Sequence, residues 1–232
     1  MLSQNTPHYT FNPCVLRTSW FHNNKIQYIY IVAMNKPDEM IQKSYDQIKK
    51  YLDLNNYKIP QKIDIHKIRK EQTQIKVVYK NEELINSYPK IFLYYCYDAN
   101  VSKTNLDIII HKNGQAVNEN DIILIITKDY ASTINDLLRT KYSNYYINIY
   151  KIQDLQYNIL EHSFVSQHIK LTEIEKNDLY LKYNIENDKQ MPQISRFDPI
   201  AKAILLRPGE VCKIIRHDKI SLQNDYYRIC VG

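Results

Sequence analysis

Glu161, His162 and His168 are the side chains in this sequence that most suggest metal chemistry. A carboxylate and two imidazoles are ligands that transition metals accept in proteins. A site would need a further ligand at a suitable spacing, and isolated histidines more often have a structural role. We therefore expect no metal and no cofactor, with metal binding by these residues as the alternative.

Two arginines near the C-terminus, Arg216 and Arg228, are candidates for binding an oxyanion. A guanidinium group presents parallel N–H donors that match either a carboxylate or a phosphate. The alternative is a solvated strand face on which both side chains meet only water. The two residues by themselves do not decide between these interpretations.

The densest basic region covers residues 40–70, which carry eight Lys or Arg against three Asp. Lys43, Lys49 and Lys50 lie in its first half. Such a stretch can follow the phosphates of a nucleic acid without reading its bases. From these residues alone, a solvated helix face is the default interpretation.

The sequence lacks the motifs on which an active site of its own would depend. A restriction-type nuclease needs Asp or Glu, one residue, then Lys, so that carboxylates hold a divalent ion beside the lysine. No such triplet occurs, and with only three glycines a Gly-rich phosphate loop is excluded. We expect a non-catalytic chain, and a stand-alone nuclease or other nucleic-acid-processing protein is the alternative.

The composition of the 232 residues is typical of a folded protein, with 44% hydrophobic and 24% charged residues. The net charge of +6 permits a polyanionic neighbour without requiring one. We find no signal-peptide pattern and no apolar run of membrane-spanning length, and expect a soluble intracellular chain with no membrane partner. The cysteines form no C-x-x-C pair, so we expect buried free thiols at Cys14, Cys96, Cys212 and Cys230.

The first 150 residues have the pattern of a mixed α/β unit. Residues 26–32 are rich in β-branched and aromatic side chains and predict a strand. A helix is predicted over 38–53, because apolar residues recur there at helical spacing. The residues of this stripe are Ile41, Tyr45, Ile48 and Leu52.

Five short apolar runs after residue 75 predict further strands. Behind a possible cap at Ser132, a helix is predicted between the last two of them. These two strands should therefore be parallel, with a right-handed crossover. The five runs are residues 75–80, 90–97, 106–111, 121–127 and 145–151.

The C-terminal third has strong local signals. Thr172 and Glu175 form a capping box that opens a helix of about ten residues. Residues 186–196 are polar and predict a connector. Asp198 followed by Pro199 predicts a short helix that Pro208 and Gly209 end. Two strands, 210–216 and 225–231, should then follow, joined by a link at 217–224 that is long for a hairpin.

Residues 161–231 resemble the C-terminal domain of the RNA polymerase subunit five family, which has an archaeal counterpart. EHSFVSQHIKL is similar to that family's E-H-x-x-V-x-x-H stretch, and MPQISRFDPIAKAILLRPGEVCKIIR is similar to its P-x-I-x-x-x-D-P-[VI]-A helix, R-P-G-[DE]-V turn and K-I-I-R strand. Order and spacing agree throughout. The chain departs from the family at three places: HDKISL replaces a P-S-x-T-A-G link, Ser166 replaces a proline, and Leu205 replaces a small residue.

In this family the domain docks on the largest polymerase subunit, which implies an acidic protein partner for the two arginines. The resemblance implies interface roles for nine residues: Asp198, Pro199, Ala201, Gly209, Val211, Lys213, Arg216, Tyr227 and Arg228.

Upstream, residues 90–162 follow the order of the family's jaw domain, which in eukaryotic enzymes flanks the incoming downstream DNA. The resemblance implies that Lys43, Lys49 and Lys50 lie near this duplex and contact it without sequence preference. Residues 1–37 match nothing in the family. We therefore expect an N-terminal extension over 1–37, a jaw-like domain over 38–158 and an assembly domain over 159–232.

The expected fold is α+β, with a mixed α/β jaw-like domain followed by a small α+β assembly domain. The expected function is that of a non-catalytic subunit of a multisubunit DNA-directed RNA polymerase, with no small-molecule substrate. Abundant Ile, Lys, Asn and Tyr, together with the divergent link, favour a large DNA virus as the source, or else a protist. The location would be a virion or viral factory in the first case and a nucleus in the second.

Overall fold

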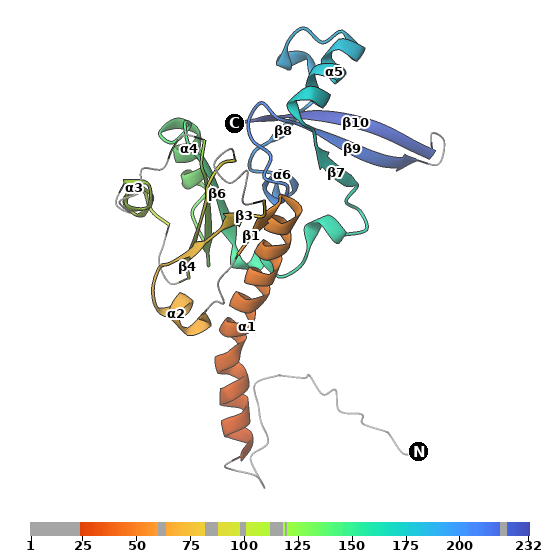
Figure 1. Cartoon of the computed structure of the whole chain (residues 1–232). Helices are drawn as coiled ribbons and strands as arrows, with labels where there is room; N and C mark the ends of the chain where they lie inside the picture. The colour runs from red at the N-terminus through yellow and green to blue at the C-terminus, as the bar shows by residue number, and fades with distance from the viewer. Residues whose placement is uncertain are drawn as a thin grey trace, which may run out of the picture. The chain divides into compact units, whose positions relative to one another are not determined.

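The computed structural model describes residues 24–59, 64–81, 88–97, 101–111, 118, 120–218 and 222–232, with the backbone alone at 24–36, 111 and 218. The chain divides into two compact units, residues 1–37 and 38–232. The second unit combines helices with small mixed sheets, which confirms the predicted α+β class (Figure 1).

Helix α1 (Asn24–Leu54) contains both of the first two predicted elements. The strand prediction for 26–32 is wrong, because β-branched and aromatic residues favour strands only where a pleated surface is available to pack on. The helix continues through Pro37. The helix prediction for 38–53 is confirmed, and its predicted apolar stripe is buried at Ile41, Tyr45, Ile48 and Leu52.

The first four-stranded sheet has three parallel strands and one antiparallel edge strand. Its order is β2 (Thr73–Lys76), β4 (Ile91–Cys96), β5 (Ile122–Thr127) and β6 (Tyr146–Lys151), with β2 antiparallel to β4. The predicted strands at 90–97, 121–127 and 145–151 are confirmed, and so is the parallel pairing of the last two. The run predicted as one strand at 75–80 falls into two strands, the end of β2 and β3 (Val78–Tyr79). Strand β3 pairs with β1 (Tyr57–Lys58) in a separate two-stranded sheet.

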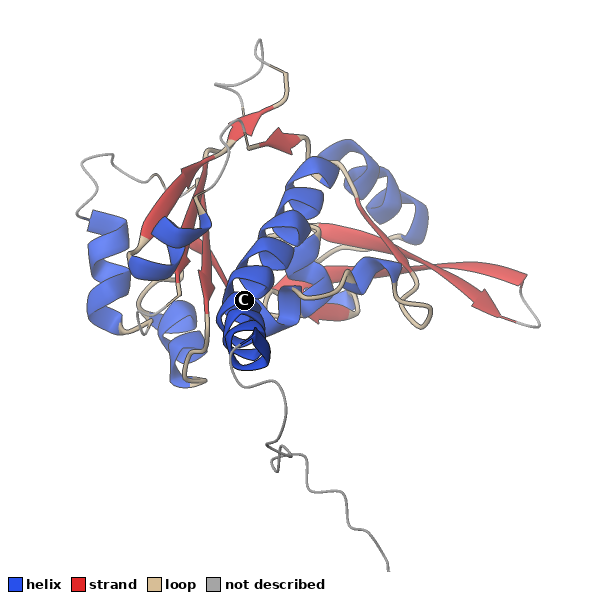
Figure 2. Ribbon diagram, turned by 90° about the horizontal axis from the view of Figure 1, so that it is seen from below, coloured by secondary structure: helices blue, strands red, loops and turns tan. Residues whose placement is uncertain are grey.

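Helices cover both faces of this sheet (Figure 2). On one face, side chains of α1 pack against Leu93, Leu124 and Tyr150. On the other face, Ile123 and Ile125 pack against two helices, α3 (Lys103–His111) and α4 (Thr133–Thr140). The three strands β4, β5 and β6 are therefore buried along nearly their whole length.

Two details of these helices differ from expectation. The strand predicted at 106–111 is wrong, since this run forms α3. Its apolar residues Leu106, Ile109 and Ile110 recur at i, i+3 and i+4, which places them on one helical face against the sheet. Ser132 precedes α4 as predicted but makes no capping hydrogen bond through its side chain. The further short helix α2 (Ile65–Lys70) is capped by Asp64.

A second four-stranded sheet forms the C-terminal part of the chain. Its order is β7 (Gln167–Lys170), β9 (Val211–Asp218), β10 (Leu222–Val231) and β8 (Gln193–Ser195), with β8 parallel to β10 and the other pairs antiparallel. Strand β8 and the short helix η4 (Asp188–Gln190) lie where we predicted only a connector. Helix α5 (Glu173–Tyr183) begins with the predicted capping box of Thr172 and Glu175.

The predicted long link between the last two strands is much shorter. Leu222 pairs with Asp218 and Asn224 pairs with Arg216, so most of the region 217–224 belongs to the hairpin itself. The intervening residues 219–221 lie outside the described part of the chain. Polar residues at the ends of both strands hid this extension, because the ladder depends on backbone pairing and needs no apolar side chains there.

Side-chain hydrogen bonds join strand β6 to the region of α6 (Pro199–Ala203). The Tyr150 hydroxyl donates to the carbonyl of Lys202 at 2.8 Å, and Lys202 Nζ donates to the carbonyl of Ile149 at 3.0 Å. The Arg196 guanidinium donates to the carbonyl of Ile147 at 3.1 Å. Two short helices, η2 (Ile152–Leu155) and η3 (Ile159–Glu161), follow β6 along the chain.

Three of the four cysteines can be assessed, and they are buried free thiols as predicted: Cys96, Cys212 and Cys230. Burial raises the pKa of Cys96 and of Cys212 to about 11, and that of Cys230 to about 12. These thiols stay protonated near neutral pH. Cys14 lies outside the described residues.

Candidate subunit interface

The short helix α6 depends on the cap that the sequence predicts. Asp198 Oδ1 accepts hydrogen bonds from the backbone N–H groups of Ile200 at 2.8 Å and Ala201 at 3.4 Å. Pro199 occupies the first turn, where the lack of an N–H group has no cost. Ala201 is fully buried against the sheet, where its small side chain allows close packing. These three predicted interface residues therefore build the helix itself.

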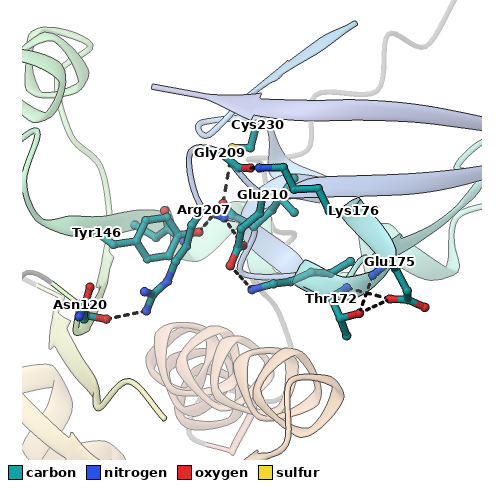
Figure 3. A network of polar contacts seen from close by, with 12 residues as sticks. Asn120, Tyr146, Thr172, Glu175, Lys176, Arg207, Gly209, Glu210 and Cys230 are labelled. Carbon is teal, nitrogen blue, oxygen red and sulfur yellow. Dashed lines mark hydrogen bonds and ion pairs between the residues drawn. The ribbon is translucent and has the colours of Figure 1, made fainter. Parts of the chain in front are cut away.

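The turn from Arg207 to Glu210 holds several parts of the chain together (Figure 3). The Arg207 guanidinium donates to the carbonyl of Asn120 at 2.6 Å and lies 5.3 Å from the centroid of the Tyr146 ring. The Arg207 backbone N–H donates to Glu210 Oε2 at 2.7 Å, and Glu210 Oε1 pairs with Lys170 Nζ at 2.7 Å. One turn thus contacts the first sheet and strand β7.

Gly209 has a backbone conformation in this turn that would be strained in a residue with a side chain. Its φ of +87° lies in the region that L-residues rarely adopt. Its N–H donates to the carbonyl of Cys230, and its carbonyl accepts from Lys176 Nζ of α5 at 2.8 Å. Val211, the next predicted interface residue, is buried against α5 with Ile229. Both residues have intrachain roles.

Two arginines lie further along the hairpin, on the face that also packs against α6, and of these Arg216 is exposed and Arg228 is half-buried. In the β9–β10 ladder, Arg216 lies opposite Asn224, and alternate residues of a strand share a face. Arg216, Tyr226 and Arg228 therefore project together. The Arg216 guanidinium lies 4.2 Å from the centroid of the Tyr226 ring, and that of Arg228 lies 5.6 Å from it.

Tyr226 orients the two arginines without neutralising them. Cation–π contacts at partly exposed sites contribute on the order of 0.5–2 kcal/mol each and leave the N–H donors available. Within the described residues, neither arginine forms an ion pair with a carboxylate, and Arg228 Nε is buried without a hydrogen-bond partner. Two guanidinium groups held close to the same ring match a carboxylate-bearing surface.

Lys213 and Tyr227 lie on the opposite face of the hairpin. Lys213 Nζ pairs with Asp225 at 2.7 Å, and the Tyr227 ring lies 6.2 Å from the ring of Tyr183 in α5. The structure therefore does not bring the nine predicted interface residues into one surface. Sequence reasoning also missed Tyr226, although its position two residues before Arg228 places the two on one strand face.

Glu161, His162 and His168 each have separate partners. Glu161 Oε1 accepts from Asn158 at 2.8 Å and lies 3.6 Å from Lys50 Nζ, while His162 Nδ1 accepts from the N–H of Phe164. His168 Nδ1 lies 2.6 Å from the carbonyl of Ser166. In the described part of the chain, no three His, Cys, Asp or Glu residues are placed to hold a metal ion.

Burial is the main cause that lowers the pKa of His168. The hydrogen bond to Ser166 and the carboxylate of Asp198 oppose this effect, and the cations of Arg228 and Arg216 add to it. The lowered pKa keeps His168 neutral near pH 7. The α6 face of the sheet therefore carries its positive charge on the two arginines and on Lys170, which lies opposite Cys212 and pairs with Glu210.

The predicted DNA-proximal lysines lie on the solvent side of α1. Lys43, Lys49 and Lys50 are all exposed, and Lys50 forms a surface ion pair with Glu161. Such pairs contribute little to stability and exchange readily with other partners. Further along the basic region, Arg69 pairs with Asp38 at 3.5 Å and Lys67 with Glu71 at 3.8 Å.

None of the described helices is both long and apolar enough to cross a membrane.

Residues 157–230 match the family model described as RNA polymerase Rpb5, C-terminal domain. Over these residues the chain is similar to the C-terminal domain of Rpb5. The matched region contains α5, α6 and the whole second sheet, so the Rpb5 resemblance inferred from the motifs is confirmed there.

Relatives extend the similarity upstream. The chain is 27% identical to the DNA-directed RNA polymerases I, II, and III subunit RPABC1 of Caenorhabditis elegans over 142 residues, which are 61% of this chain and 66% of the relative. It is 32% identical over 114 residues to the DNA-directed RNA polymerases IV and V subunit 5B of Arabidopsis thaliana, which covers 49% of this chain and 51% of the relative. These alignments span just under two thirds and about half of the relatives' own lengths.

Proposed function

We propose that the chain is a non-catalytic subunit of a multisubunit DNA-directed RNA polymerase and docks on the largest subunit through residues 159–232. The observation that carries this proposal is the Rpb5 match over 157–230, because relatives in that family are named as polymerase subunits. The location of the chain is then that of the polymerase it serves. The domain boundaries, the viral or protist source and a role in the jaw stay predictions.

The docking contact that we propose centres on Arg216, Tyr226 and Arg228. Asp198, Pro199, Ala201, Gly209 and Val211 shape the helix and turn beneath it, so they act on docking through the fold. The two guanidinium groups both lie near the Tyr226 ring and lack a described acidic partner. Carboxylates of the partner would supply the missing charge, with each charge-assisted bond contributing roughly 1.5–3 kcal/mol.

Charge reversal at both arginines tests the docking proposal. Arg216→Glu with Arg228→Glu should prevent the chain from co-purifying with the two large polymerase subunits, at a cost of about 3–6 kcal/mol. The matched control is Lys182→Glu with Lys189→Glu, which changes the net charge equally at two exposed residues away from the stack. Melting curves would establish that both double variants fold.

The outcomes separate the candidate functions. A folded Arg216/Arg228 variant that enters the polymerase like the wild type would remove the arginines from the interface. If the wild-type chain never co-purified with polymerase subunits and degraded DNA alone, it would instead be a nuclease with a similar C-terminal module.

The jaw role includes contact with downstream duplex DNA, for which Lys43, Lys49 and Lys50 are the candidates. A few exposed lysines bind DNA weakly unless the rest of the polymerase holds the duplex nearby. Lys43→Ala with Lys50→Ala should therefore lower the slope of log K against log salt of the assembled enzyme by up to about 2, at roughly 0.9 per contact. Lys103→Ala with Lys182→Ala serves as the control, and an unchanged slope in the first variant would mean that these lysines are only solvated.

A further inference from the structure

Strand β7 lies at an open edge of the second sheet. In the strand order it pairs with β9 on one side and with no described strand on the other (Figure 1). An unpaired edge leaves backbone donors and acceptors available to another strand. Three of the four β7 residues are exposed, so side chains do not cover this edge.

The hydrogen bond next to β7 shows which backbone groups face outward. The N–H of Leu171 donates to the carbonyl of Val211, and in an antiparallel ladder the residues that bond to the partner alternate. Gln167 and Ile169 therefore bond to β9. The N–H and C=O groups of His168 and Lys170 point away from β9, toward the open edge.

A groove of about 530 Å³ runs beside this edge. Its volume lies within the roughly 300–1,000 Å³ of clefts that hold ligands in proteins. All four residues of β7 line it, and apolar side chains from other segments complete it. These are Leu54 at the end of α1, Leu160 in η3, Val165 before β7, and Ile204 at the end of α6.

The charges along the groove are already paired. Glu161 lies against Lys50, and Lys170 against Glu210. His168, the remaining titratable residue of the described lining, is held neutral by its burial and by Arg228 and Arg216, against the opposing effect of Asp198. Among the described residues, a phosphate or an acidic segment finds no free cation here, in contrast to the Arg216 and Arg228 face.

We propose that the β7 edge takes an extended, uncharged segment of the polymerase subunit on which the domain docks, and that this segment adds a fifth strand to the sheet. Its backbone would bond to the outward groups of His168 and Lys170. Alternate side chains would be apolar, since one face of an added strand meets Leu160 and Ile204 and the other meets solvent. This inference rests on the proposed function, and it assigns a second contact separate from the arginine stack.

Hydrogen exchange in the wild-type protein tests the proposal directly. In the free chain, the amides of His168 and Lys170 should exchange rapidly, whereas the amide of Ile169, which bonds to β9, should exchange slowly. In the purified polymerase, the two outward amides should become at least tenfold slower, because each gains a hydrogen bond. Unchanged exchange at both amides in a polymerase that contains the chain would overturn the inference and leave the proposed function intact.

A pair of variants tests the same hydrogen bond by assembly. His168→Pro removes the outward N–H, while His168→Ala removes the side chain and keeps the N–H. Because this N–H does not bond to β9, proline at this position removes no hydrogen bond between β7 and β9. We expect His168→Pro to be incorporated at least tenfold more weakly than His168→Ala, with similar melting temperatures.

Two results would contradict the proposal. One is equal incorporation of the two variants. The other is a concentration-dependent dimer of the free wild-type chain, seen by light scattering, that protects the same amides, since the occupant would then be a second copy of this chain.

Discussion

The two four-stranded sheets of residues 38–232 use their surfaces in opposite ways. In the first sheet, β4 and β5 are buried at every position, with α1 on one face and α3 and α4 on the other. In the second sheet, β7 and the distal half of β10 are largely exposed. The covered strands β4 and β5 pack against the protein's own core, whereas the exposed edge strand β7 and the unpaired arginines of the second sheet are available to a partner.

The similarity to known proteins follows the same division. The family model matches the second sheet and its helices, whereas the 142-residue alignment with the Caenorhabditis elegans relative extends upstream of the matched residues at 27% identity overall. Within the second sheet, the residues of the recognised motifs mostly maintain its shape, such as Asp198 at the cap and Gly209 in the turn. The motif therefore preserves a framework and ends at the exposed Arg216, while the half-buried Tyr226 lies beyond it on the hairpin.

The largest effect that we predict concerns the first sheet. Ile125 in β5 is fully buried between packed side chains. Ile125→Ala should lower the free energy of unfolding by about 2–5 kcal/mol, because it leaves a cavity in a closed core. Ile169→Ala on the exposed strand β7 is the matched control and should change it by less than about 1 kcal/mol. Urea denaturation measures both, and equal losses would mean that the two sheets do not differ as described.

The contact between the sheets should make stability depend on pH. Burial lowers the pKa of Lys202 from its usual 10.5 to about 8. Between these values the unfolded chain binds the proton more tightly than the folded chain, so the free energy of unfolding gains a contribution as pH rises. From about pH 7.5 to about pH 9.5 this gain should be roughly 2 kcal/mol relative to Lys202→Met. If the free energy of unfolding changed with pH in the same way for the wild type and Lys202→Met, the pKa of Lys202 would not be lowered by folding.

The smallest effect concerns the cap of α6. Asp198→Ala should cost about 1 kcal/mol of stability, because the first-turn N–H groups lose their side-chain acceptor, and Asp198→Asn should retain most of it. Thermal melting compares the two. If Asp198→Ala melted like the wild type, solvent would cap the helix equally well, and the D-P motif would not be needed to shape the second sheet.

Local sequence was sufficient to predict the features that depend on residues within about four positions of one another. The cap at Asp198, the capping box at Thr172 and the turn at Gly209 are of this kind, because each is a hydrogen bond or backbone conformation set by local side chains. Buried parallel strands were also predictable as continuous apolar runs. The Rpb5 resemblance rested on the order and spacing of these same local signals.

The remaining features depend on how the chain packs in three dimensions. Residues 26–32 and 106–111 fit both a strand and a helix by composition, and the surface available to pack on selects between them. The hairpin extends to Asp218 and Leu222 through backbone pairing that side chains do not encode. The alignment of Arg216 and Arg228 on one ring, the separation of Lys213 onto the other face and the open edge of β7 all depend on strand register and order. These are set by contacts between residues far apart in the chain, which no local pattern specifies.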